Sequence, residues 1–391
     1  MKLWNKDYKF NEAIERFTVG DDYILDQKLV KYDCLASIVH AKMLGKIGIL
    51  KSKEVNQIVH ELKNIIVLDK DGKFKIAEED EDCHTAIENY LTKKLGDVGK
   101  KIHTARSRND QVLTALRLYE KDELQDCKKL VKTFSAGMKV FSNKYGKVGF
   151  PGYTHTRKAM PSSIKLWATA FIDSMNDNIK VIDSTLDLID QSPLGTGAGY
   201  GVPLKLDRQY TAKLLGFKAV QENPIYAQLS RGKFESTIIH VLSLITGDLN
   251  RMASDMILFS LSEFGYFELP KEFCAGSSIM PHKKNPDVLE LIRAKHHTIV
   301  SLEFEIKNIT SNLISGYHRD FQLTKGSTMK ALDITKQSLS VMSLVFTGLV
   351  INKEKCEQAM TKEIYAAEEA IKLSKKGIPF RDTYKKVSKD Y

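Results

Sequence analysis

The sequence predicts an all-α fold, because apolar residues recur every three or four positions over unusually long distances. Five such stretches cover residues 124–141, 164–189, 234–259, 292–313 and 332–349. Helices of roughly 25 to 30 residues would be about 40 Å long at the usual helical rise. This length exceeds that of ordinary globular helices and predicts a long bundle. Apolar residues also lie beside the main stripes, which indicates packing against other subunits.

Shorter helices are predicted on both sides of this bundle. Residues 26–44 and 53–68 are amphipathic, with Gly45 and the turn around Gly72 as stop signals. The acidic run at residues 78–82 suits the start of a third helix, because negative charge is favourable at a helix N-terminus. A short charged helical piece follows residue 351. We therefore expect three domains, listed here in chain order: an N-terminal helical domain at 1–105, a central long-helix domain at 106–350, and a short C-terminal helical domain at 351–391.

Composition excludes several classes of protein. The 391 residues are 42% hydrophobic, which is enough for a sizeable core, and the longest apolar run is too short to cross a bilayer. Five cysteines without a C-x-x-C pair, and an N-terminus without a signal-peptide core, favour a reduced cytoplasmic protein. The net charge of +10 comes from lysines scattered along the chain, which argues against a dedicated nucleic-acid surface. The sequence has no HExxH, Walker A or paired Cys/His spacing, so it gives no support for metal catalysis.

Polar clusters interrupt the helical pattern at predicted helix ends. The first, HTARSRND at residues 103–110, precedes the first long helix. Ser107 and Asp110 have the spacing of a capping box, which would be a purely structural role. Arg108 and Asn109 also suit carboxylate recognition, because a guanidinium offers a planar fork of donors. The residues alone leave both explanations open.

Two other polar clusters contain side chains that are candidates for a functional role. His155 lies in a turn bounded by glycine and proline, where a neutral imidazole would suit proton transfer, although isolated histidines are more often structural. Residues 316–325, GYHRDFQLTK, supply several donors after the fourth long helix, and a solvated loop would explain them equally. Both clusters therefore remain candidates.

The glycine-rich segment PLGTGAGYG, at residues 193–201, raises the question of a dinucleotide-binding loop. The G-x-G-x-x-G pattern fails, because the sixth position counted from Gly195 is Tyr200 and a helix precedes the segment. Close approach of the backbone to a substrate or a neighbouring chain is the better explanation.

The most informative segment is GSSIMPHKKNP at residues 276–286. Asn285 is a suitable N-cap and Pro286 suits the first helical position. The segment therefore places Ser277 and Lys283 on a loop before a helix N-terminus, where free N–H groups and the helix dipole favour anions. An ordinary surface loop before a capped helix is the alternative.

Together these segments resemble the argininosuccinate lyase family of the fumarase/aspartase superfamily. Residues 276–286 are similar to the family's mobile loop, and the four other clusters occur in the family's order. Residues 81–88 add a further match, while residues 159–163 and 226–233 resemble a bacterial subgroup. The resemblance implies a three-domain, all-helical subunit that forms a homotetramer with a multi-helix core and active sites shared by three subunits. The implied reaction is the reversible β-elimination of argininosuccinate to arginine and fumarate, without a cofactor or a metal.

The resemblance also implies residue roles. Ser277 is the expected base, with Lys283 and the helix start stabilising its alkoxide. His155 is the expected acid for the departing guanidino nitrogen, and Glu290 from another subunit orients it. Ser107 and Arg108 are expected on the succinyl side of the substrate. The remaining expected substrate-binding residues are His84, Asn109, Thr154, Asn285, Tyr317, Gln322 and Lys325.

Three departures from the family pattern leave alternatives open. Thr156 follows the candidate acid, where a Leu-Gln pair is common, and no substrate-binding serine is found near residues 19–22. The chain also ends at Tyr391, several dozen residues before many family members, so the third domain is expected to be short. The rivals are an adenylosuccinate lyase-like, fumarase-like or aspartase-like enzyme, a lyase for N-acylated argininosuccinate, a catalytically silent helical scaffold, and a basic nucleic-acid-binding protein.

Overall fold

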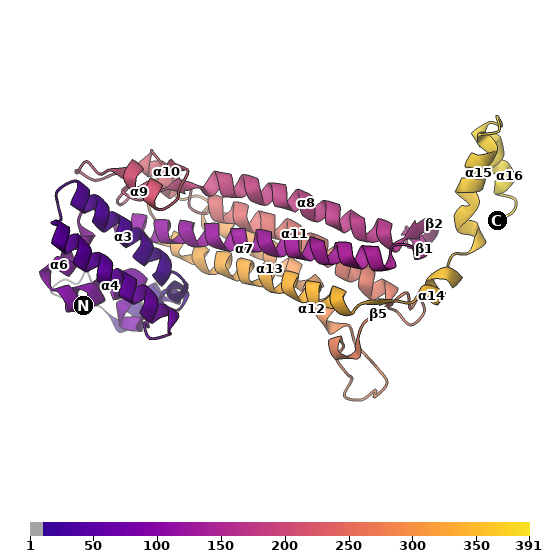
Figure 1. Cartoon of the computed structure of the whole chain (residues 1–391), viewed down its shortest axis with the longest axis horizontal. Coiled ribbons are helices and arrows are strands. Elements are labelled where there is room, and N and C mark those ends of the chain that lie inside the picture. Colours follow the sequence, from indigo (N-terminus) through magenta and orange to yellow (C-terminus); the bar gives the residue numbers. More distant parts are fainter. Residues whose placement is uncertain (1–10) are drawn as a thin grey trace. The chain divides into compact units, whose positions relative to one another are not determined.

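Helices dominate the computed structural model, which describes residues 11–391 (Figure 1). The prediction of an all-α fold is confirmed. The helices before the bundle and within its connections are α1 (Glu12–Val19), α2 (Asp22–Leu25), α3 (Val30–Lys46), α4 (Ser52–Lys70), α5 (Cys83–Leu95), α6 (Asp97–Lys100), α9 (Arg208–Leu214) and α10 (Pro224–Leu229). The long helices are α7 (Arg108–Tyr145), α8 (Ile164–Ile189), α11 (Lys233–Phe259), α12 (Asp287–Ile309) and α13 (Gln322–Gly348). Three short helices end the chain: α14 (Lys353–Gln358), α15 (Ala366–Ser374) and α16 (Phe380–Val387).

The chain divides into two compact units, and all five long helices pass through both. Unit 1 comprises Met1–Asp126, Ile182–His240 and Ser301–Leu332. Unit 2 comprises Cys127–Val181, Val241–Val300 and Asp333–Tyr391. The three-domain division with boundaries at residues 105 and 350 stays a prediction.

The five long helices lie where the apolar periodicity placed them. Helix α7 is the longest at 38 residues, because Leu113, Leu116 and Tyr119 extend its buried side well before the predicted stretch. In unit 2 the helices pack through aromatic side chains. Phe134 of α7 and Phe346 of α13 have ring centroids 5.8 Å apart, and Trp167 of α8 donates to Asp255 of α11 at 2.9 Å.

The predicted helices of the N-terminal part are also found in unit 1. Helices α3 and α4 pack directly against each other, and a Cβ at Gly45 would lie 2.7 Å from Cγ2 of Val55. Glycine is therefore needed for their close approach. The third predicted helix, α5, is capped by Asp82, whose side chain accepts from the N–H of Thr85 at 2.9 Å.

Three small two-stranded sheets were not predicted. They are β1 (Gly149–Thr154) with β2 (Arg157–Ser163), β3 (Gln191–Ser192) with β4 (Ala219–Val220), and β5 (Phe267–Glu268) with β6 (Val350–Ile351). The first is an antiparallel hairpin in which Pro151 lies opposite Pro161. Proline cannot donate to a ladder and argues against a strand in a sequence, so the pattern concealed this hairpin.

Two further features concern the chain as a whole. Among residues 11–391, none of the helices is long and apolar enough to span a membrane. All five cysteines are free thiols, and four of them are buried.

Candidate active site

The sequence-predicted site residues fall into two groups, one in each unit. Unit 1 holds His84, Ser107, Arg108, Asn109, Tyr317, Gln322 and Lys325. Unit 2 holds Thr154, His155, Ser277, Lys283, Asn285 and Glu290. The structure therefore brings most predicted binding residues together separately from the predicted base and acid, and each group is described by itself.

A pocket in unit 1 collects five of the predicted binding residues. They are Arg108, Asn109, Tyr317, Gln322 and Lys325, and they line it together with Asp22, Asp26, Asp82, Val112, Leu116, Arg231, Arg319 and Phe321. These residues come from the start of α7, the start of α13 and the segments before α3, α5 and α11. The pocket wall is thus mostly charged and contains both acids and bases.

Lys325 is held at the wall of this pocket by two carboxylates. Its side chain is only 4% exposed, and its Nζ forms ion pairs with Asp26 and, at 2.9 Å, with Oδ1 of Asp22. Burial lowers the pKa of Lys325, but the negative charges of Asp26 and Asp22 outweigh burial and raise that pKa overall. Lys325 is therefore a fixed cation.

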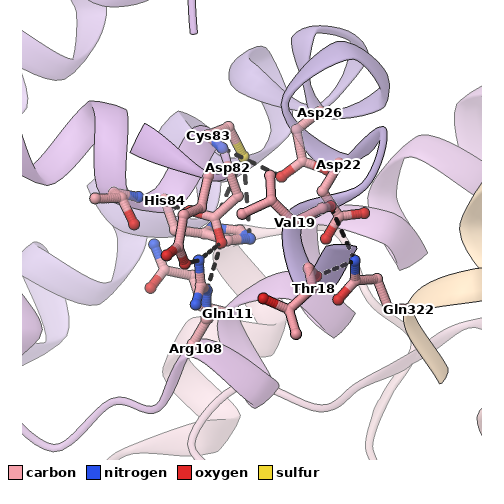
Figure 2. A network of polar contacts seen from close by, with 12 residues as sticks. Thr18, Val19, Asp22, Asp26, Asp82, Cys83, His84, Arg108, Gln111 and Gln322 are labelled. Atoms are coloured by element: carbon pink, nitrogen blue, oxygen red, sulfur yellow. Dashed lines mark hydrogen bonds and ion pairs between the residues drawn. The ribbon is translucent and has the colours of Figure 1, made fainter. Parts of the chain in front are cut away.

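Arg108 is the second fixed cation. Its guanidinium pairs with Asp82 (Figure 2). Its Nη2 also lies 3.1 Å from Oε2 of Glu81. Burial lowers the pKa of Arg108, whereas Asp82 and Glu81 raise it, and the net shift is upward. A guanidinium held on one side by two acids keeps a defined orientation toward the pocket.

Tyr317 and Gln322 occupy defined positions in the same wall. The amide nitrogen of Gln322 donates to the carbonyl oxygens of Thr18 and Val19, both at 3.1 Å, and thereby satisfies the C-terminal end of α1 (Figure 2). The ring of Tyr317 lies beneath the Arg231 guanidinium, 5.2 Å from its carbon.

His84 lies in a buried network rather than in the pocket wall. Its side chain is 2% exposed and its Nδ1 pairs with Asp33, which also accepts from Nε2 of Gln111 at 2.9 Å. Burial lowers the pKa of His84, but Asp33 raises it and determines the net direction. The predicted contact of His84 with substrate stays a prediction, and the geometry gives this residue a supporting position.

One group of possible metal ligands belongs to this network. Donor atoms of Asp26, Cys83 and His84 lie within 4.8 Å of one another. Asp26 already holds the Lys325 ammonium, and burial raises the pKa of the Cys83 thiol well above its usual value. A neighbouring ammonium and a protonated thiol do not fit a divalent cation, which needs deprotonated ligands.

The start of α7 confirms the structural part of the Ser107–Asp110 prediction. The N–H of Ser107 donates to Oδ1 of Asp110 at 2.9 Å, and the Ser107 hydroxyl accepts from the N–H of Asn109 at 3.2 Å. Oδ2 of Asp110 also accepts from the N–H groups of Gly195 and Gly197, at 2.9 and 3.1 Å. Asp110 therefore connects the α7 terminus to the glycine-rich segment.

The glycine-rich segment makes its close approach within the chain itself. Gly199 has a φ of +106°, and a Cβ there would lie 2.8 Å from Cγ of Gln228. Within the chain, the backbone is confined by Asp110 and Gln228 of unit 1, and the expected approach to a substrate or a neighbouring chain stays a prediction. The rejection of a dinucleotide loop is unaffected.

The loop that carries Ser277 is closed at its base in unit 2. Ala275 and Asn285 exchange two backbone hydrogen bonds, at 3.0 and 2.8 Å, and the nine residues between them, 276–284, are mostly exposed. The Ser277 hydroxyl oxygen accepts from the N–H of Met280 at 3.1 Å and from that of Ile279 at 3.4 Å. Two amide donors aimed at one oxygen stabilise negative charge on it.

The helix after this loop differs slightly from the prediction. Helix α12 begins at Asp287, and the side chain of Asn285 donates to the carbonyl of Gly276 at 3.5 Å instead of capping the helix. Lys283 and Glu290 are both exposed. The loop thus presents an alcohol and a cation to solvent.

His155 lies at the tip of the β1–β2 hairpin. His155 and Thr156 form its two-residue turn, with φ values of +50° and +59°, and both side chains are exposed. A turn with two positive φ values normally uses Asn-Gly, so His-Thr costs conformational energy, especially at the β-branched threonine. Strain of this kind is typical of functional positions. Thr154 ends the strand immediately before the turn.

Sequence reasoning did not assign a role to Asp22, Asp26, Arg231 or Arg319. Asp22 lies in the segment where a binding serine was sought, and Arg231 lies in the subgroup segment at residues 226–233. An acid in the first segment and an arginine in the second were visible signals. Their convergence on one pocket was not, because it depends on packing.

Comparisons with known proteins agree with this architecture. Residues 3–301 match the protein family described as Lyase. The argininosuccinate lyase of Thermotoga neapolitana is 55% identical over 390 residues, which covers 100% of this chain and 98% of that protein. The argininosuccinate lyase of Phocaeicola vulgatus is 43% identical, covering 100% of this chain and 87% of that protein.

Solved structures are similar in fold. An EDDS lyase in complex with formate has a TM-score of 0.79 at 23% identity, covering 97% of this chain and 76% of that one. A class II fumarase from Schistosoma mansoni also has a TM-score of 0.79, at 17% identity, covering 98% of this chain and 93% of that one. With the family match and the full-length relatives, the conclusion is plain: the chain belongs to the argininosuccinate lyase family, within the fumarase/aspartase superfamily of lyases.

Proposed function

We propose that this chain catalyses the reversible β-elimination of argininosuccinate to L-arginine and fumarate, using its own side chains as general base and general acid. The observation that carries the proposal is the similarity over the whole chain to argininosuccinate lyases, at 55% identity to that of Thermotoga neapolitana. The charged pocket supports it, because a substrate with carboxylates, an ammonium and a guanidinium needs both acidic and basic partners.

The reaction begins with removal of a proton from the succinyl carbon next to a carboxylate. The electron pair moves onto that carboxylate, and the carbon–nitrogen bond to the guanidino group then breaks. We assign the proton removal to Ser277, whose alkoxide the Met280 and Ile279 N–H groups would stabilise. Lys283 on the same loop adds a positive charge to this environment.

When the carbon–nitrogen bond breaks, its electron pair stays on the guanidino nitrogen. A proton must be delivered to this nitrogen so that arginine leaves with a complete guanidino group. We assign this step to His155, which the strained hairpin turn presents at its tip. Glu290 from another subunit would orient the imidazole. Arg108, Asn109, Thr154 and Asn285 would hold the carboxylates.

Assembly is part of the proposal. The unit 1 pocket contains five of the predicted binding residues but neither the proposed base nor the proposed acid, which belong to the exposed loop and hairpin of unit 2. We therefore propose a homotetramer in which each active site combines groups from three subunits. Light scattering after size-exclusion chromatography tests the assembly, and a stable, active monomer would contradict it.

The decisive experiment is an assay for fumarate release from argininosuccinate by the purified full-length chain. Fumarate is followed by its ultraviolet absorption and arginine by amino-acid analysis. The two products are expected in equal amounts. Adenylosuccinate, malate and aspartate serve as competing substrates for the other lyases of the superfamily. Turnover of one of these, with none of argininosuccinate, would reject the proposed function.

A further inference from the structure

The unit 1 pocket contains one acid that differs from the others. Asp26 is fully buried, holds Lys325 and accepts from the N–H of Cys83 at 3.2 Å. Asp82 holds Arg108 and caps α5. Asp22, by contrast, is 18% exposed at its side chain and faces the pocket. Its ion pair among the described residues is the one with Lys325.

The charge on Lys325 is already matched without Asp22. Asp26 supplies one negative charge to the ammonium, so Asp22 and Asp26 together carry one negative charge more than Lys325. Burial raises the pKa of Asp22 although Lys325 lowers it, and Asp26 raises it further. Lys325 therefore compensates the charge of Asp22 only in part, and an incoming cation would add to this compensation.

Arg231 is the complementary group in the same pocket. Arg231 is 5% exposed, and among residues 11–391 no hydrogen-bond acceptor is found for its Nε and Nη1. Its guanidinium lies over the rings of Tyr317 and Phe321, with its carbon 5.2 Å from each centroid. A buried guanidinium that lies over two aromatic rings and has unfilled donors is suited to a carboxylate.

We propose that Asp22 and Arg231 bind the free amino-acid head of the substrate, with Asp22 taking the α-ammonium and Arg231 the α-carboxylate. This inference rests on the proposed function and specifies it: the substrate carries an unmodified α-amino group. An N-acyl group would replace the ammonium by a neutral amide and place an extra carbonyl oxygen against the Asp22 carboxylate. Asp22 is then the residue that selects argininosuccinate over N-acylated forms.

The test compares the full-length enzyme on argininosuccinate and on N-acetylargininosuccinate. Wild type is expected to have a kcat/KM roughly 10- to 100-fold higher for the free amino form, as expected for one lost charge-assisted hydrogen bond. Asp22→Asn keeps the shape of the side chain and leaves Asp26 to hold Lys325. It should raise KM for argininosuccinate with a smaller change in kcat, and it should abolish the preference between the two substrates.

Asp21→Asn is the matched control, because Asp21 is the exposed neighbour and does not line the pocket. It should leave the preference unchanged. Wild-type preference for the N-acetyl substrate, or a preference that persists in Asp22→Asn, would overturn the inference while leaving the lyase reaction intact. Fumarate from neither substrate would instead reject the proposed function.

A binding measurement keeps the inference testable without turnover. Calorimetric titration of the wild-type chain with L-arginine and with Nα-acetylarginine should give tighter binding of L-arginine. Arg231→Gln should weaken binding of L-arginine and of its Nα-acetyl form alike, because both keep the carboxylate, whereas Asp22→Asn should weaken only L-arginine. Equal binding of both compounds to wild type would overturn the assignment of Asp22.

Discussion

The unit 1 pocket and the unit 2 loop around Ser277 are built on opposite principles. In the pocket, Lys325 and Arg108 are each held by two carboxylates and lie mostly out of solvent. In the loop, Lys283 is exposed and Ser277 is held by two backbone N–H groups. If the proposed roles hold, the binding groups are preorganised by folding, whereas Ser277 and Lys283 would reach their working geometry only when the loop closes. Substitutions in the two regions should therefore fail in different ways.

Removing the Ser277 hydroxyl should give the largest loss of activity with no loss of stability. Ser277→Ala is expected to lower kcat/KM by roughly 10²- to 10⁴-fold, the usual contribution of a general base, without changing the unfolding temperature. Ser278→Ala, in the neighbouring exposed position, is the control and should keep most activity. Steady-state kinetics and thermal unfolding measure both effects. Near-normal kcat/KM in Ser277→Ala would remove the base assignment.

The two lysines provide a direct contrast between the regions. Lys325→Met leaves Asp22 and Asp26 without their cation in a buried place and should cost about 3–5 kcal/mol of unfolding free energy. Lys283→Met changes an exposed side chain, so it should cost less than about 0.5 kcal/mol while still lowering kcat. Urea unfolding followed by circular dichroism gives both values. Equal destabilisation by the two variants would contradict the comparison.

The buried Asp33–His84 pair predicts a pH window for stability. Burial raises the pKa of Asp33, but His84 outweighs burial and lowers that pKa overall. The ionised Asp33 carboxylate therefore contributes fully to the free energy of unfolding above its unfolded pKa of about 3.9, and this contribution is lost as pH falls through the lower folded pKa. The pKa of His84 is raised in the folded chain. Its charged imidazole therefore contributes fully to the free energy of unfolding below pH about 6.5, and this contribution is lost as pH rises through the folded pKa.

The unfolding temperature of wild type should therefore exceed that of Asp33→Asn/His84→Gln most clearly between about pH 4 and pH 6.5. The difference should shrink on the acid side and on the alkaline side of this window. Thermal unfolding across the pH range measures it, with Lys283→Met as a variant that should follow wild type throughout. A constant difference at every pH would show that the pair contributes by packing rather than by charge.

The smallest contrast concerns two glycines. Gly232 has a φ of +77°, and a Cβ there would lie 2.4 Å from Cγ2 of Thr310, whereas a Cβ at Gly276 would meet nothing within 4 Å. Gly232→Ala should cost at least about 1–2 kcal/mol from the left-handed backbone alone, and Gly276→Ala should be close to neutral in stability. Chemical unfolding compares them. A greater loss of stability in Gly276→Ala than in Gly232→Ala would contradict the comparison.

Much of this architecture was predictable from the sequence. Apolar periodicity located the five long helices, because a bundle helix must repeat its buried face along its whole length. The cap at Ser107–Asp110 and the loop before α12 follow from local chemistry within a few residues. The β1–β2 hairpin was missed, since its facing prolines and its His-Thr turn both violate the usual local signals.

Other features depend on contacts that no local pattern contains. Asp22 and Arg231 are separated by more than two hundred residues and meet at one pocket only because α2 and the segment before α11 fold into the same unit. The glycine-rich segment illustrated the same limit. Its need for close approach was evident, while its partner, Gln228, was not.

The double role of Asp110 has a consequence for inherited variation in this chain. One carboxylate anchors both the first turn of α7 and the backbone at Gly195 and Gly197. A bulky replacement at either glycine would pull on this anchor and tilt the helical end from which Arg108 and Asn109 project. A substitution in the glycine-rich segment, which has no catalytic group, would then weaken the affinity for substrate. The cause would be sought at Arg108 and Asn109 although it lies in that segment.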